Sequence, residues 1–138
     1  MKKPFDILLI EDNEAEAELL RITFAEMPII NRLVHVGTNK EALEYLEENH
    51  PNLGLIISDF FINCEIDNEV VLKAAYEKNI PFIYLSGCDD TFTVVESFRQ
   101  GALAFLQKPL IINQFLAVVK GLESLGIEIV PTKVEAKA

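Results

Sequence analysis

The sequence predicts an α/β fold: a doubly wound (βα)5 three-layer sandwich with a five-stranded parallel sheet and helices on both faces. Short apolar runs alternate five times with longer amphipathic stretches along the 138 residues. The runs are continuously apolar, which is typical of strands covered on both faces of a parallel sheet. Right-handed crossovers and a length suited to one domain then favour an open, doubly wound sheet.

Each predicted strand is a short apolar run bounded by charged or turn-forming residues. The first reads FDILLI, the third LGLIIS and the fourth PFIYLS, so all three can be buried on both faces. The five strands are expected at residues 5–10, 32–36, 53–58, 81–86 and 103–107.

The predicted helices follow the strands and carry start or stop signals. They are expected at residues 14–27, 39–50, 69–79, 91–100 and 110–125. Asn13, Thr38 and Asp90 can cap three of them, and Gly101 suits a left-handed stop after the fourth. Pro51 lies just beyond the second. The first helix is expected to bury a stripe of Ala17, Leu20, Ile22 and Phe24, and the second to bury Ala42, Leu43 and Leu46.

Composition and charge narrow the classes of partner. A formal net charge of -10 repels nucleic acid and anionic membrane surfaces, so protein partners or cations are favoured. Cys64 and Cys88 are too few for a disulfide framework, which favours a reduced, cytoplasmic protein. The N-terminus lacks the pattern of a signal peptide, and no apolar window is long enough to cross a bilayer. One domain is expected over 1–125, followed by a loosely held tail over 126–138.

Charged and hydroxyl side chains follow four of the five predicted strands. Glu11 and Asp12 follow the first strand, Asp59 the third, Ser86 the fourth and Lys108 the fifth. Taken singly, each also suits a solvated helix start or an ordinary turn. Because ligands of doubly wound sheets bind outside the carboxyl ends of the strands, their joint placement favours one shared site.

These residue types suit phosphoryl transfer. Carboxylates packed together repel one another unless a cation joins them, and Mg²⁺ prefers such oxygen ligands. Lys108 and the Ser86 hydroxyl can hold an anion beside the metal. Asp59 can act as a nucleophile that forms an aspartyl-phosphate.

Over roughly residues 4–125 the chain resembles the receiver domain of two-component response regulators. The resemblance is carried by LLIED with Glu11 and Asp12, LIISD with Asp59, PFIYLSG with Ser86, and GALAFLQKPL with Lys108-Pro109. These motifs occur in the order and at the spacing of the family. The resemblance implies a flavodoxin-like strand order 2-1-3-4-5.

The resemblance also implies a role for each matching residue in the acidic site. Asp59 would be the phosphoacceptor, and Mg²⁺ would be the cofactor. Asp12 would bind the metal directly, with Glu11 close by and Asp59 as a further ligand. The backbone carbonyl of Phe61 would complete the metal site.

Four further residues match the switch positions of the family. Ser86 would turn toward the phosphoryl group and Lys108 would pair with it. Phe105 matches the aromatic residue that changes rotamer in the switch. The Lys108–Pro109 peptide bond is expected to be cis.

The loop after Asp59 departs from the pattern of the family. Asn63 replaces the usual Pro, and Asn68 lies near the usual Gly, where its tolerance of positive φ can preserve the turn. Phe61 and Cys88 occupy positions that tune the lifetime of the phosphate in the family. We expect Phe61 to shield the phosphoryl group from water and Cys88 to be a small packing residue without a redox role.

The resemblance implies a single-domain signalling protein. A histidine kinase or phosphotransfer protein would phosphorylate Asp59, and the domain would act as a conformational switch or phosphorelay intermediate. A downstream protein would bind the face of the fourth helix, fifth strand and fifth helix, and a homodimer is compatible with this scheme. The chain would be no enzyme beyond its own phosphorylation and dephosphorylation.

Two alternatives belong to other classes. A pseudo-receiver would be a phosphorylation-independent interaction module, which the altered loop favours and the intact set of site residues opposes. An enzyme of the same topology is less well supported, because a haloacid-dehalogenase-type phosphatase needs an acid where Phe61 stands. A flavodoxin would need a hydroxyl-rich loop after the first strand, and no GxxxxGK[ST] motif is present.

Overall fold

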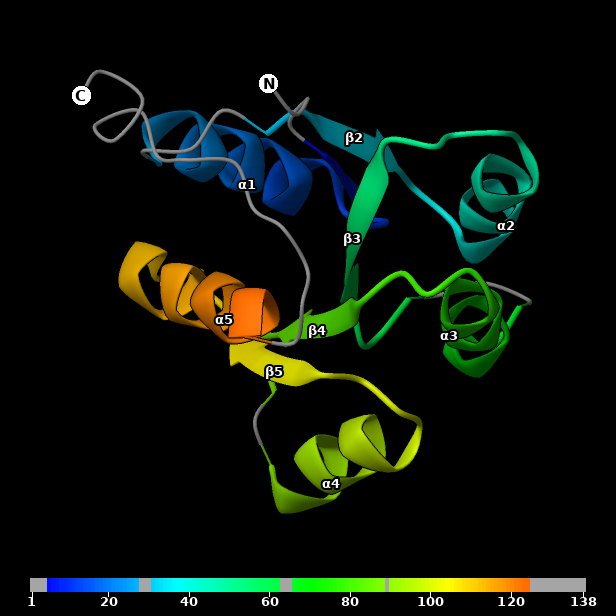
Figure 1. Ribbon diagram of the computed structural model, residues 1–138. Coiled ribbons are helices and arrows are strands. Elements are labelled where there is room, and N and C mark those ends of the chain that lie inside the picture. Colours follow the sequence, from blue (N-terminus) through cyan, green and yellow to red (C-terminus); the bar gives the residue numbers. More distant parts are fainter. Residues whose placement is uncertain (1–4, 28–30, 63–65, 89, 125–138) are drawn as a thin grey trace.

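Five strands alternate with five helices in the computed structural model, which describes residues 5–27, 31–62, 66–88 and 90–124 (Figure 1). The strands are β1 (Asp6–Ile10), β2 (Leu33–Val36), β3 (Leu53–Asp59), β4 (Phe82–Ser86) and β5 (Ala104–Gln107). The helices are α1 (Glu14–Glu26), α2 (Asn39–Glu47), α3 (Asn68–Glu77), α4 (Thr91–Arg99) and α5 (Ile112–Ser124). The predicted tail over 126–138 lies outside the described residues.

The sheet is parallel throughout and has the order β2-β1-β3-β4-β5, which confirms the predicted fold class. Ile10 pairs with Ser58, and Asp59 pairs with Leu85. Strands β1, β3 and β4 therefore end at the same edge, and the residues that follow them meet there.

The helix start signals work as the sequence indicates. The side chains of Asn13, Thr38 and Asp90 accept hydrogen bonds from backbone N–H groups at the start of α1, α2 and α4. Gly101 follows α4 with φ 107, so it provides the left-handed stop. Helix α5 begins at Ile112, two residues later than expected.

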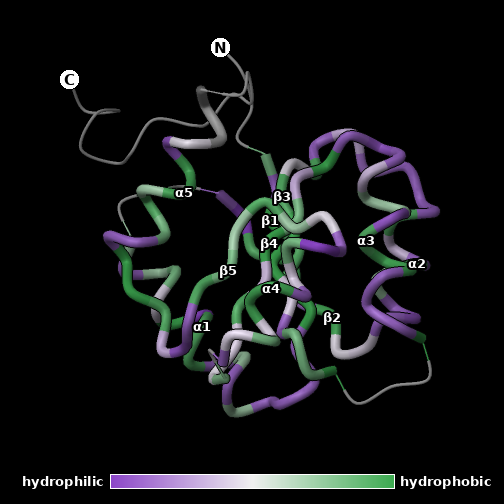
Figure 2. Tube along the Cα trace, turned by 90° about the horizontal axis from the view of Figure 1, so that it is seen from below, coloured by the Kyte–Doolittle hydropathy of each residue, from purple (hydrophilic) through white to green (hydrophobic). Residues whose placement is uncertain are grey.

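Two apolar clusters hold the layers together. Figure 1 shows α1 and α5 on one side of the sheet and α2 and α3 on the other. In Figure 2 the strands β1, β3 and β4 form the hydrophobic centre. The first cluster joins α1 and α5 to the sheet through Leu20, Phe24, Phe115, Val119, Ile7, Leu9, Ile57 and Leu85. The second joins α2 and α3 to the other face through Ala42, Leu46, Val71, Leu72, Ala75, Leu8, Ile10 and Ile56.

The prediction that Ile22 belongs to the buried stripe of α1 is wrong. Ala17, Leu20 and Phe24 are buried, but Ile22 is 48% exposed. Residues 20 and 24 are one helical turn apart and share a face, whereas position 22 lies about 200° around the helix from position 20. Ile22 therefore faces away from the sheet.

Helix α4 has the reverse of the usual pattern. Its buried side chains are the hydroxyl-bearing Thr93 and Ser97, and the Ser97 hydroxyl donates to the Thr93 carbonyl at 2.8 Å. Phe92, Val95 and Phe98 are exposed. The apolar side of this helix thus faces solvent beside β5.

No helix in the described part of the chain is long and apolar enough to span a membrane.

Candidate functional site

A lysine held by three carboxylates lies at the carboxyl edge of the sheet. The Lys108 ammonium donates to Glu11 Oε1 at 2.6 Å, to Glu16 Oε2 at 2.9 Å and to Asp59 Oδ2 at 3.3 Å. Two of these acids come from the ends of β1 and β3, and the third comes from the first turn of α1. The structure therefore brings together Glu11, Asp59 and Lys108, as the sequence predicted, and adds Glu16.

The backbone explains why these side chains meet. Glu11 directly follows β1, Asp59 ends β3, and Lys108 directly follows β5. The Lys108 N–H donates to the Ser86 carbonyl at 2.8 Å, which extends the pairing of β5 with β4 by one residue. The Lys108–Pro109 peptide bond is cis, the geometry that the family resemblance implies.

Burial makes the electrostatics of the cluster strong. The Glu11 side chain is 1% exposed, and those of Asp59 and Lys108 are 11% and 13% exposed, whereas Glu16 is 44% exposed. Burial, together with the nearby Asp59 charge, raises the pKa of Glu11 to about 7 even though the Lys108 hydrogen bond opposes this. Burial alone would lower the pKa of Lys108, but its hydrogen bonds to Glu11 and Glu16 raise it overall.

The donor set fits a hard divalent cation. Carboxylate oxygens of Glu11, Glu16 and Asp59 all lie within 4.8 Å of one another. Mg²⁺ and similar cations take such oxygen ligands and retain several waters. Asp12, expected as a direct ligand, is exposed and is not part of this cluster. The roles of Asp12 and the Phe61 carbonyl as ligands remain predictions.

Both oxygens of Asp59 take part in long contacts. Oδ2 accepts from Lys108, and Oδ1 accepts from the backbone N–H of Phe61 at 3.3 Å. By contrast, Glu11 is held by the short Lys108 contact, and its other oxygen accepts from the Asn13 N–H at 3.3 Å. Asp59 is thus the more weakly held of the two buried acids, which suits a group that must react.

Ser86 ends β4 and is fully buried. Its hydroxyl accepts a hydrogen bond from the Cys88 N–H at 3.1 Å. The Cys88 side chain is exposed and its thiol donates to Asp90 Oδ2 at 2.7 Å, so the expectation that Cys88 is a packing residue is wrong. The reason is that the strand has already ended at Ser86, and residue 88 lies in the loop that caps α4.

Two asparagines hold the segment after Asp59, and their roles were missed. The Asn68 side-chain amide donates to the Phe60 carbonyl at 2.5 Å. Buried Asn39, on α2, donates to Asn68 Oδ1 at 2.9 Å and to the Ile66 carbonyl at 2.7 Å.

Asn68 does not supply the positive φ that was expected of it. It is the first residue of α3, and Asn79 is the only non-glycine residue with positive φ in the described ranges. Asn63 lies outside the described residues. Phe61 is 55% exposed as a residue, and its ring packs edge-on against that of Phe60. Its expected shielding role remains a prediction.

Phe105 is partly buried against the α2–α3 side of the core. On the neighbouring strand, its paired residue Tyr84 is fully buried and donates its hydroxyl to Gln100 Oε1 at 2.6 Å. Phe60 packs edge-on against Tyr84, with ring centroids 5.0 Å apart. A chain of contacts therefore runs from the residue after Asp59 to the end of α4.

Glu16 was not among the residues that the sequence predicted for the site. A signal for a wider role was present, because a helix that follows a strand begins at the carboxyl edge of the sheet. Side chains in its first turn can therefore reach the same site as the strand ends.

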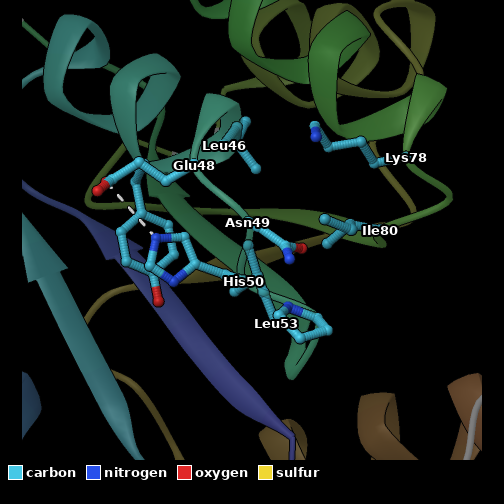
Figure 3. A pocket seen from close by; sticks show the side chains of 9 residues that line it. Leu46, Glu48, Asn49, His50, Leu53, Lys78 and Ile80 are labelled. Carbon is cyan, nitrogen blue, oxygen red and sulfur yellow. Dashed lines mark hydrogen bonds and ion pairs between the residues drawn. The ribbon is translucent and has the colours of Figure 1, made fainter.

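Two of the hollows lined by described residues lie at opposite edges of the sheet. One of about 350 Å³ lies beside the cluster and is lined by Glu16, Leu19, Leu20, Thr23, Lys108, Pro109 and Leu110. The other, of about 220 Å³, lies at the opposite edge of the sheet. Figure 3 shows Lys78 and Ile80 on one side of it and the Glu48–His50 pair on the other. Only the first hollow adjoins the acidic site.

The chain matches no protein-family model. It is similar to the response regulator Rcp1 of Synechocystis, with 25% identity over 135 residues that cover 92% of each protein. It is 26% identical over 106 residues to the methanogenesis regulatory protein FilR1 of Methanothrix harundinacea, covering 75% of this chain but only 24% of FilR1.

Solved structures of response regulators have the same fold as this chain. The bacteriophytochrome response regulator AtBRR superposes with a TM-score of 0.75 at 25% identity, covering 94% of this chain and 98% of AtBRR. The Mn²⁺-bound form of Rcp1 superposes with a TM-score of 0.66 at 23% identity, covering 94% of this chain and 99% of Rcp1.

Proposed function

From the premise that the chain has the fold and the sequence likeness of response regulator receiver domains, we propose that it is a phosphorylation-dependent signalling switch or phosphorelay intermediate. Asp59 accepts the phosphoryl group from a phosphohistidine of a histidine kinase or phosphotransfer protein. The observation that carries this proposal is the Lys108 ammonium 3.3 Å from Asp59 Oδ2 at the edge of the sheet.

Asp59, Lys108 and Ser86 have separate roles in the proposed phosphoryl transfer. A carboxylate oxygen of Asp59 attacks phosphorus as the bond from phosphorus to the histidine nitrogen breaks, and the leaving imidazole then takes up a proton. The Lys108 ammonium donates to the phosphoryl oxygens and neutralises part of their charge. The Ser86 hydroxyl, which ends the adjacent strand, supplies a further hydrogen bond.

Glu11 and Asp59 supply carboxylate ligands for a divalent cation, with Asp12 and the Phe61 carbonyl as proposed further ligands. When bound, Mg²⁺ adds positive charge at the transferring group. The carboxylate oxygens of Glu11 and Asp59, which together with that of Glu16 lie within 4.8 Å of one another, support the roles of Glu11 and Asp59. The Mn²⁺-bound form of Rcp1 is compatible with a divalent cation in this fold.

Output is proposed to pass through the face of α4, β5 and α5. Its exposed apolar side chains are Phe92, Val95, Phe98, Leu103 and Ile111. Such a patch suits a protein partner or a second copy of the chain. Residues 1–125 are proposed as the receiver unit and 126–138 as a tail, in the cytoplasm as the cysteine content suggests.

The test is the intact mass of the protein after incubation with a small-molecule acyl phosphate, with and without Mg²⁺. We expect the gain of one phosphoryl group only with Mg²⁺, and no gain for Asp59→Asn. Absence of both labelling and Mg²⁺ binding would refute the assignment of Asp59 as phosphoacceptor.

The second candidate is a phosphorylation-independent interaction module. The Asn39–Asn68–Phe60 hydrogen bonds favour it, because they hold the segment after Asp59 through side chains of the protein itself. Mg²⁺ binding, measured by calorimetry, separates the two candidates, since an interaction module has no need of it.

A further inference from the structure

Glu16 completes the coordination of the Lys108 ammonium. A lysine ammonium has three N–H donors, and Glu11, Glu16 and Asp59 each accept one. All three donors are thus used by carboxylates that come from different parts of the chain.

The proposed reaction changes two of these three contacts. Glu11 is a proposed cation ligand, so its negative charge is shared once a cation is held. Asp59 receives the phosphoryl group and is no longer a free carboxylate. Glu16 lies within 4.8 Å of both acids, but it is not among the proposed cation ligands and does not receive the phosphoryl group. Its 2.9 Å contact with Lys108 can therefore persist while the other two change.

The local structure holds Glu16 at this point. Its backbone N–H donates to the capping side chain of Asn13 at 3.0 Å, in the first turn of α1 directly after β1. Its half-exposed carboxylate contacts the Lys108 ammonium beside the hollow that both residues line together with Leu20 and Pro109. The contact therefore joins α1 to the segment after β5.

We propose that Glu16 is a positioning residue that holds the Lys108 ammonium beside Asp59 during phosphoryl transfer. The inference rests on the proposed function. A lysine carries its charge on a flexible four-carbon stem, so a third carboxylate reduces the freedom that must be lost when the ammonium meets the phosphoryl group.

The kinetic test compares Glu16→Ala with Glu14→Ala, which removes the same charge from an exposed position in the same helical turn. With acyl phosphate and saturating Mg²⁺, we expect Glu16→Ala to slow phosphorylation about three- to fivefold, as suits a half-exposed ion pair. Glu14→Ala should stay close to the wild-type rate. Glu16→Gln should lie between, because its amide oxygen still accepts a hydrogen bond.

Two further readouts separate positioning from a general effect on folding. In a Lys108→Met background, Glu16→Ala should have no additional effect on the rate, because the group that it positions is gone. In the metal-free protein, NMR should show faster exchange of the Lys108 ammonium protons with water in Glu16→Ala and unchanged exchange in Glu14→Ala.

The outcomes are distinguishable. A Glu16→Ala rate equal to or above that of Glu14→Ala overturns the positioning role and leaves the proposed function standing. An undiminished effect in the Lys108→Met background also overturns it. If the wild-type protein takes up no phosphoryl group, the proposed function fails and the positioning role fails with it.

Discussion

Lys108→Met removes the ammonium from the acidic cluster while keeping a side chain of similar length. It leaves Glu11 and Asp59, which are 1% and 11% exposed, without their shared cation. Removing one partner of a buried ion pair costs about 3–5 kcal/mol. Because Glu11 can limit the loss by taking up a proton, we expect the free energy of unfolding to fall by about 3 kcal/mol at pH 8 in the absence of Mg²⁺.

The loss should depend on pH in a defined direction. The pKa of Glu11 is raised from 4.5 to about 7 in the folded protein, so as pH falls below 7 the side chain becomes neutral and its ion pair disappears. Lys108 itself stays protonated at both pH values, because its hydrogen bonds to Glu11 and Glu16 raise its pKa. The change between pH 5 and pH 8 therefore comes from the titration of Glu11. At pH 5 we therefore expect a loss of only about 1 kcal/mol.

Urea denaturation at pH 5 and pH 8, followed by circular dichroism, measures both values. Lys73→Met, at an exposed position on α3, is the matched control and should change little at either pH. Added Mg²⁺ should restore part of the loss at pH 8. An equal loss at the two pH values would show that the ionisation of Glu11 does not control the effect, and would refute the electrostatic argument.

Three further perturbations test other parts of the structure. In the metal-free protein, the free energy of unfolding should decrease as pH rises from 5 to 8, because the folded pKa of Glu11 lies above its unfolded value. In the Glu11→Gln variant, the decrease in the free energy of unfolding between pH 5 and pH 8 should be smaller by about 2 kcal/mol, measured by urea denaturation. Asn68→Ala should lower stability by about 1–2 kcal/mol and speed amide exchange after Asp59, because the Phe60 carbonyl loses its donor; unchanged exchange would contradict this. Gly101→Ala should cost about 1 kcal/mol in thermal melts, because φ is 107 there. Gly121→Ala in α5, where an added Cβ meets nothing within 4 Å, should be neutral or stabilising.

The sequence was sufficient to predict the architecture because its strong signals are local. Continuous apolar runs predicted β1, β3 and β4, and side chains that can cap a helix predicted three helix starts. Ile22 was assigned to the core because it is apolar and lies between two core positions. The helical period, applied strictly, places it on the other side.

The site was only partly predictable, because its details depend on contacts between distant segments. Strand ends are found from the apolar pattern, and so Glu11, Asp59 and Lys108 could be placed on one edge. Glu16 contacts Lys108 across 92 positions of sequence, and Asn39 contacts Asn68 across 29. The place of Glu16 in the first turn of α1 indicates the edge of the sheet but not its partner, and no local pattern predicts the asparagine pair.

The reversed polarity of α4 affects the free energy that is needed to open this part of the fold. Burial of apolar surface supplies about 25 cal/mol per Å², and α4 contributes hydroxyl-bearing side chains in place of aliphatic ones on its inner side. Lifting it from the sheet therefore forfeits little hydrophobic free energy, because Phe92 and Val95 are in water before and after. In an amide hydrogen-exchange experiment α4 should be among the first helices to exchange, well before α1 and α5. The first cluster thus holds α1 and α5 on the sheet through buried apolar surface, whereas α4 is held beside β5 with little of it.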